Sequence, residues 1–310
     1  MTLAADPLDD FLAGAGAGTD LGELLETIGL LLALPGIVIA IGLVAFVYFV
    51  LTPSSVAETR VVGRTLAVCG VLTLVGGLVE SVGAVAIGAG TWIDDLANTW
   101  QPLLRLMSGA LMTVGFLGNT PPVSEVARSR RLRALGAIGV MAGALSFATD
   151  GHTVSRGDVL LNASLDVVHV LAAGVWVGGI AGLVIMAVRR RVGIEDGPLA
   201  PAMVRFSTVA TLAIVSLAAA GAGMSLLIVD SVSDYWKTDW GRLLLVKVAL
   251  VGAAGGLGGY NHFVVVPGLE VDPANRALLS RAKRTIGAEA VILLIVTLVT
   301  VFLTGASIDE

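Results

Sequence analysis

Residues 27–51 read TIGLLLALPGIVIAIGLVAFVYFVL and carry no charged side chain. A helix of about 20 apolar residues crosses the roughly 30 Å hydrocarbon core of a bilayer, so this run predicts a membrane-spanning helix. Comparable apolar runs recur along the chain, at 27–51, 65–90, 102–118, 134–149, 160–188, 206–229, 241–266 and 285–305. We therefore predict an all-α integral membrane protein, a bundle of about eight transmembrane helices.

The composition supports this class and excludes others. Of the 310 residues, 56% are hydrophobic and 14% charged, whereas soluble domains average about 25% charged residues. The mean hydropathy is +0.91. A net charge of −5 offers no basic surface, so we expect no nucleic-acid partner. A single cysteine, Cys69, excludes an intramolecular disulfide and any multi-cysteine metal site. The partner that remains is the lipid bilayer.

The cations predict the orientation of the chain. Of the 19 Lys and Arg residues, 14 lie between alternate spans, at Arg60–Arg64, Arg128–Arg133, Arg189–Arg205 and Arg276–Arg284. The opposite side carries Arg156, Lys237 and Arg242. By the positive-inside rule the Arg-rich side is cytoplasmic. We therefore expect a multi-pass protein of the cytoplasmic (plasma) membrane with both termini extracytoplasmic.

Three segments follow from this pattern. Residues 1–26 hold six acidic side chains and no Lys or Arg, which is not the pattern of a signal peptide and predicts an acidic extracytoplasmic tail. Residues 27–149 hold the first four transmembrane helices, and 150–310 hold the last four. The acidic outer face would concentrate cations near the protein. A solvated surface suited to high salt is an equally good explanation of that acidity.

Two histidines are expected at the outer mouth of the bundle. His169 lies 20 residues before Arg189, about 30 Å along a helix, which places it at the outer boundary. Asp166 lies on the same helix face and could orient its imidazole, and Trp176 continues that face inward. His152 follows the fourth span. We predict a metal site on these two histidines, with a third ligand from Met224, Met107 or Asp150; an ordinary interfacial histidine is the alternative.

Four charged residues fall inside predicted spans, where charges are costly and often functional. Glu80 and Arg105 lie in the outer halves of adjacent spans, so we predict a salt bridge. For Lys247 we predict burial and pairing with Asp166. Glu289 is expected near the inner end of the last span, where its side chain would reach the interface. Buried pairs that only hold helices in register are the alternative to a proton- or cation-coupled pathway.

Two predicted spans are rich in glycine, and a third histidine, His262, lies in one of them. Gly174 and Gly178 in the fifth span, and Gly252–Gly259 in the seventh, allow close approach of helix backbones, so we expect both spans to be buried. His262 is expected at the inner end of the seventh span, too far from His169 to share a site. We assign it no role.

Five short motifs give the second half a family resemblance. In order they are Asp150-Gly151-His152, the run Asp166–Gly179 with His169 and Trp176, Arg205-Phe206-Ser207, Gly241–Lys247, and Asn261 with Pro267. In order and spacing this pattern resembles the copper-resistance protein D (CopD) family. The resemblance implies an eight-span inner-membrane protein tied to copper uptake or delivery, often with a periplasmic or extracellular copper-binding partner. His152 and His169 match the histidines of the family.

The function expected from residues and resemblance together is copper transport or delivery at the cytoplasmic membrane, serving copper uptake, homeostasis or resistance. The copper ion is the ligand or the transported substrate, and we expect no enzymatic activity. Two alternatives stay open. One is a membrane redox protein with a single b-type haem, held by His152 and His169 or by a His–Met pair, since three histidines on two sides exclude only a protein with two bis-His haems. The other is a non-transporting copper chaperone or accessory subunit for an oxidase.

Overall fold

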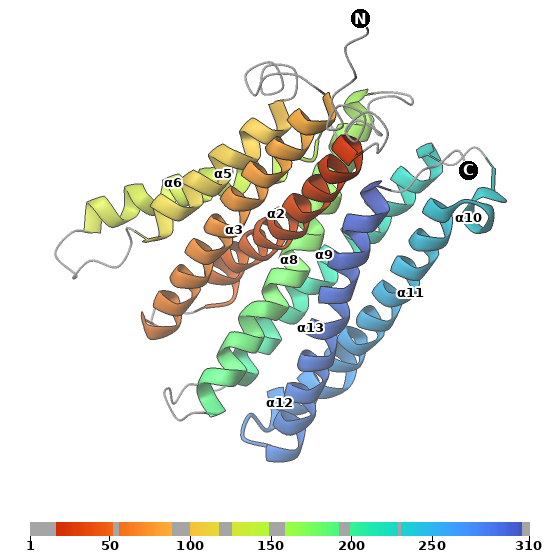
Figure 1. The fold of residues 1–310 in the computed structure, drawn as a ribbon. Helices are drawn as coiled ribbons and strands as arrows, with labels where there is room; N and C mark the ends of the chain where they lie inside the picture. Colours follow the sequence, from red (N-terminus) through yellow and green to blue (C-terminus); the bar gives the residue numbers. More distant parts are fainter. Residues whose placement is uncertain are drawn as a thin grey trace, which may run out of the picture.

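In the computed structural model, the described residues are 17–51, 56–88, 100–117, 126–148, 159–191, 199–228 and 231–305, and they contain helices and no strand. Eight long helices run roughly along one direction (Figure 1). They are α2 (Ala17–Phe49), α3 (Val56–Gly88), α5 (Trp100–Leu117), α6 (Val126–Leu145), α8 (Val159–Arg191), α9 (Leu199–Ile228), α11 (Asp239–Tyr260) and α13 (Arg276–Gly305). Shorter elements are α10 (Asp234–Lys237), the π-helix η1 (Asn261–Val265) and α12 (Val266–Val271).

The apolar runs correspond to these helices one for one. Within the described residues, six helical stretches are long and apolar enough to cross a membrane: Leu21–Phe49, Arg60–Val85, Val159–Arg189, Leu199–Leu227, Asp239–Val271 and Arg276–Thr304. The chain is therefore a multi-pass membrane protein of the all-helical class. The third and fourth predicted spans are α5 and α6, of 18 and 20 residues, and only α5 adds a shorter apolar stretch, Leu103–Leu117.

Two expected boundaries are wrong because helices extend past the apolar runs. The arginines at 128–133 were expected in a loop, but α6 begins at Val126, so they lie in its first turns. Similarly, α2 begins at Ala17, so residues 17–26 of the expected tail are helical. Charged residues at a helix end remain solvated while the backbone keeps its hydrogen bonds, so polarity alone does not end a helix.

Helix α2 runs antiparallel to α3 and parallel to α8. A Cβ on Gly29 of α2 would lie 2.6 Å from the Glu80 nitrogen of α3, and one on Gly83 would lie 2.8 Å from the Glu26 nitrogen, an antiparallel register. Along α8 and α2 the contacts advance together, since Gly174 meets Ile41 and Gly182 meets Phe46, so these two helices run parallel. The first turn of α2 and the last turn of α13 lie at the same end of the bundle (Figure 1). That this end is extracytoplasmic remains a prediction.

The glycines of the fifth span bring two helices together. A Cβ on Gly42 would lie 2.1 Å from the Gly174 carbonyl oxygen, and one on Gly178 would lie 2.5 Å from the Ile39 carbonyl oxygen. Only glycine permits this separation, so α2 and α8 touch backbone to backbone. The expectation that the fifth span is buried by its glycines is confirmed.

The same expectation is wrong for the seventh span. A Cβ added at Gly252, Gly255, Gly256 or Gly259 would meet nothing within 4 Å. Only 6% of the most apolar window of Asp239–Val271 is buried, against 50% for α8. Small residues permit close packing without enforcing it, and α11 packs mainly against α13 on one side.

Candidate metal site and intramembrane cavity

His169 lies on α8 with its ring turned toward α9. A Cβ on Gly221 of α9 would lie 3.1 Å from His169 Cε1, and the imidazole is partly buried. Its Nδ1 atom is buried and has no hydrogen-bond partner among the described residues. Asp166, one turn earlier, is 7% exposed. Both residues therefore face the bundle rather than lipid.

The structure brings only part of the expected outer ligand set toward His169. Met224 follows Gly221 by three positions on α9 and is partly buried. Met107 is 47% exposed and lies with exposed Leu103 and Val114 on the outer side of α5. His152 and Asp150 lie outside the described residues. In the part of the chain that the structure describes, no three His, Cys, Asp or Glu side chains gather as a metal site.

The expected pair of Lys247 with Asp166 is wrong. Among the described residues, ion pairs join Arg105 to Glu80 and Arg242 to Asp239, and Lys247 forms none with Asp166. The expectation matched the two residues by depth in the membrane, but depth does not say which way each side chain points around its helix.

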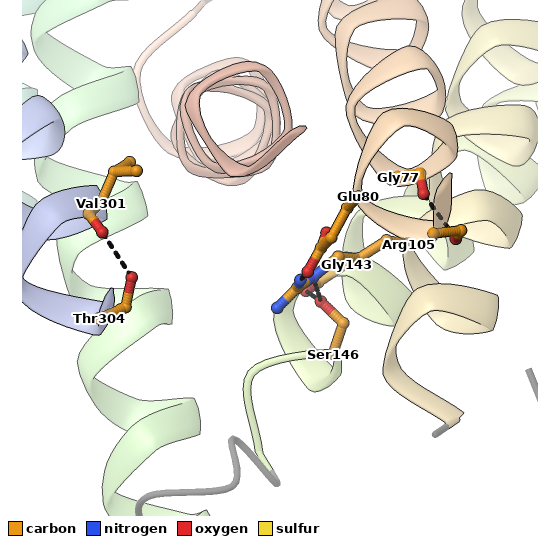
Figure 2. A network of polar contacts seen from close by, with 8 residues as sticks. Gly77, Glu80, Arg105, Gly143, Ser146, Val301 and Thr304 are labelled. Atoms are coloured by element: carbon orange, nitrogen blue, oxygen red, sulfur yellow. Dashed lines mark hydrogen bonds and ion pairs between the residues drawn. The ribbon is translucent and has the colours of Figure 1, made fainter. Parts of the chain in front are cut away.

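The predicted salt bridge between Glu80 and Arg105 is confirmed. Figure 2 shows the two side chains meeting between α3 and α5. The Arg105 side chain is also held by Ser146 Oγ, 3.4 Å from its Nε, and its Cζ lies 4.8 Å from the centre of the Phe147 ring. Arg105 is 5% exposed. The two charges neutralise each other, so this cluster joins α3, α5 and the end of α6.

Glu289 sits in a different environment, and the expectation that it reaches the interface is wrong. Helix α13 begins at Arg276, so Glu289 lies about 20 Å along it. Its side chain is 1% exposed, and Oε1 accepts a 2.7 Å hydrogen bond from Nε1 of Trp176 on α8. Trp176 is also 1% exposed. The carboxyl group is thus buried inside the bundle against a neutral donor.

Glu289 and Trp176 line a cavity of about 220 Å³ between α8, α9, α11 with η1, and α13. Most of its wall is apolar. The other polar or sulfur-bearing residues on the wall are Met203, Ser207, Thr211, Asn261 and His262. The cavity therefore combines imidazole, thioether and carboxyl groups in the second half of the chain.

A π-helix shapes the cavity wall. Residues Asn261–Val265 form η1, and π-bulges of this kind often mark functional sites. Ser207 Oγ lies 2.6 Å from His262 Nδ1, and Thr285 Oγ1 donates a 2.6 Å hydrogen bond to Asn261 Oδ1. Pro267 has no N–H for the carbonyl four residues earlier, which accounts for the irregular helix before it. That proline was the sequence signal for His262 as a site residue.

The Arg205-Phe206-Ser207 motif joins three elements to α9. Arg205 Nε donates a 2.7 Å hydrogen bond to the Val50 carbonyl at the end of α2. The Phe206 ring fills the space that Gly179 leaves on α8, where a Cβ would lie 2.0 Å from Phe206 Cε2. Ser207 holds His262. The motif is therefore mainly structural, with its last residue at the cavity.

Comparison with known proteins agrees with these motifs. Residues 200–303 match the family model of copper resistance protein D. This segment is therefore similar to the CopD family. It is 26% identical to Copper resistance protein D of Pseudomonas syringae pv. tomato over 214 residues, which cover 64% of this chain and 67% of that relative. No solved structure gives a significant match. The CopD match includes Ser207, His262 and Glu289, so most of the cavity wall belongs to it.

Proposed function

We propose that this chain belongs to the CopD family and moves copper ions across the cytoplasmic membrane, and that the ions enter at an outer site on His169. The observation that carries the proposal is the buried Nδ1 of His169, which faces α9 inside the bundle, in a chain whose residues 200–303 match the copper resistance protein D family. Neutral imidazole is a good copper ligand, and a carboxylate nearby can orient it.

The remaining outer ligands would come from neighbouring segments. Met224 on α9 lies near the level of the first turns of α8, since Gly223 faces Leu165. Its thioether suits Cu(I). His152 and Asp150 would join from the segment before α8. Met107 faces away from the bundle, so we leave it out of the proposed site.

Copper content of whole cells tests the entry site. Cells producing the wild-type chain should accumulate more copper than cells with an empty vector, measured by mass spectrometry at equal amounts of membrane protein. His169→Ala should remove most of that increase. Met107→Leu is the matched control, since Met107 is exposed on α5, and it should behave as wild type. Equal copper in His169→Ala and wild-type cells would contradict the proposed entry site.

A further inference from the structure

The two intramembrane glutamates differ in what balances their charge. Glu80 is paired with Arg105, so its carboxylate is neutralised within the protein. Glu289 accepts its hydrogen bond from the neutral indole of Trp176, and no Lys or Arg is among the described residues that line its cavity. A charged side chain within a bilayer is costly unless a partner neutralises it. Since no described lining residue supplies a positive charge, a proton or a bound cation would balance the charge of Glu289.

The cavity has room for such a partner. Its volume of about 220 Å³ exceeds the roughly 30 Å³ share of one water molecule, so a cation and several waters fit. Gly258 of α11 faces the carboxyl group, and a Cβ there would lie 3.3 Å from Glu289 Oε1. A glycine at this position keeps the space beside the carboxyl group open.

The imidazole of His262 lies about one helical turn from that space. His262 follows Gly258 by four positions, so the two lie on the same side of the helix. Ser207 Oγ lies 2.6 Å from Nδ1 of the ring and fixes the imidazole. In the tautomer in which Nδ1–H donates to Ser207, Nε2 is the nitrogen for a ligand. Met203, one turn before Ser207 on α9, adds a thioether to the cavity wall.

We propose that this cavity is a second, intramembrane copper site in which Glu289 and His262 bind Cu(I) and Met203 contributes its thioether. The carboxylate neutralises the charge of the ion, the thioether suits its softness, and imidazole is a common copper ligand. The Trp176 indole holds Oε1 and so orients the carboxylate. The proposal rests on the proposed copper transport and names the binding site that follows the outer site along the path.

A Cu(I) titration against a chromogenic chelator, under a reductant, tests the site on the detergent-purified full chain. The His169→Ala background removes the proposed outer site and should leave one bound ion. In that background Gly258→Ala should weaken the remaining Cu(I) affinity at least tenfold, because the new methyl group crowds the carboxyl group. Gly252→Ala is the matched control on the same helix, since a Cβ there meets nothing within 4 Å.

Substitution of the ligands gives a second, independent series. Glu289→Gln keeps an oxygen for the Trp176 indole and removes the charge, and it should weaken binding at least tenfold, as should His262→Ala. Glu270→Gln, at an exposed position of α12, should not change it. Size-exclusion profiles identify any variant that has lost its fold. If a ligand variant has lost it, the Cu(I) affinity of Gly258→Ala decides whether the cavity binds the ion.

The outcomes separate the two proposals. Affinity in Gly258→Ala equal to that in Gly252→Ala, or no Cu(I) bound in the His169→Ala background, would overturn the cavity site and leave copper transport untouched. Intact Cu(I) binding in the cavity together with no copper flux in vesicles would instead overturn the proposed transport, with the site retained.

Discussion

Nε1 of Trp176 donates a 2.7 Å hydrogen bond to Oε1 of Glu289, joining α8 to α13 inside the membrane. Both side chains are 1% exposed, so water cannot replace either partner. A buried carboxyl group that loses this indole donor has no compensation for its desolvation cost from that contact. This contact therefore both stabilises the second half of the bundle and orients the carboxyl group toward the cavity.

Trp176→Phe should destabilise the protein by about 1.5–3 kcal/mol, the usual contribution of a hydrogen bond to a charged group. Unfolding of the detergent-solubilised chain measures it. Trp236→Phe is the control, because Trp236 is 56% exposed, and it should change stability little. Equal stability of the two variants would show that the Trp176 hydrogen bond does not stabilise the bundle.

The Arg105–Glu80 pair should stabilise the protein far more than the exposed pair of Arg242 and Asp239. Arg105→Met leaves a buried carboxylate unpaired and should cost about 3–5 kcal/mol. Arg242→Met breaks a pair whose side chains are 63% and 69% exposed, and it should cost less than about 1 kcal/mol. Adding Glu80→Gln to Arg105→Met should recover part of the loss. A double variant as unstable as the sum of the single variants would argue against coupling.

The α2–α8 contact should tolerate no added methyl group. In Gly178→Ala the new Cβ would lie 2.5 Å from the Ile39 carbonyl oxygen, so the helices must separate, at a cost of about 1–3 kcal/mol. In Gly256→Ala the Cβ meets nothing within 4 Å, and the greater helix propensity of alanine should leave stability unchanged or raised. If Gly178→Ala were as stable as Gly256→Ala, the close approach of α2 and α8 would be wrong.

The orientation of the chain is tested by labelling in intact cells. In a Cys69→Ala background, Ser129→Cys should resist a membrane-impermeant thiol reagent, because the Arg-rich side is expected to be cytoplasmic. Ser231→Cys, at an exposed position between α9 and α10, should react and serves as the control. The reverse labelling pattern would invert the predicted topology.

The fold was largely predictable because apolar runs decide where helices cross a bilayer. The helix ends were less predictable, since charged turns such as those at the start of α6 continue the helix beyond the run. The packing of α11 was not predictable from its glycines. Gly174 of α8 meets Gly42 of α2, but Gly252 of α11 faces open space. Gly174 and Gly252 look alike in sequence.

A contact between two site residues was predictable only where their depth in the membrane was enough to bring them together. Glu80 and Arg105 lie at equal depth on adjacent helices, so their pairing followed from the spans. The position of Glu289 was misjudged because the last span was drawn from residue 285, whereas α13 begins nine residues earlier at Arg276. His262 was placed at a helix end for the same reason, although the helical path continues through η1 and α12 to Val271.

The central claim is that the chain carries copper across a membrane, and flux into proteoliposomes tests it most directly. Vesicles with the purified wild-type chain, given Cu(I) under a reductant, should accumulate copper well above protein-free vesicles, as measured by mass spectrometry. His169→Ala should lower the initial rate at least tenfold, and Met107→Leu should not. Copper that binds to the wild-type protein but never enters the vesicles would contradict transport and favour an accessory role in copper delivery.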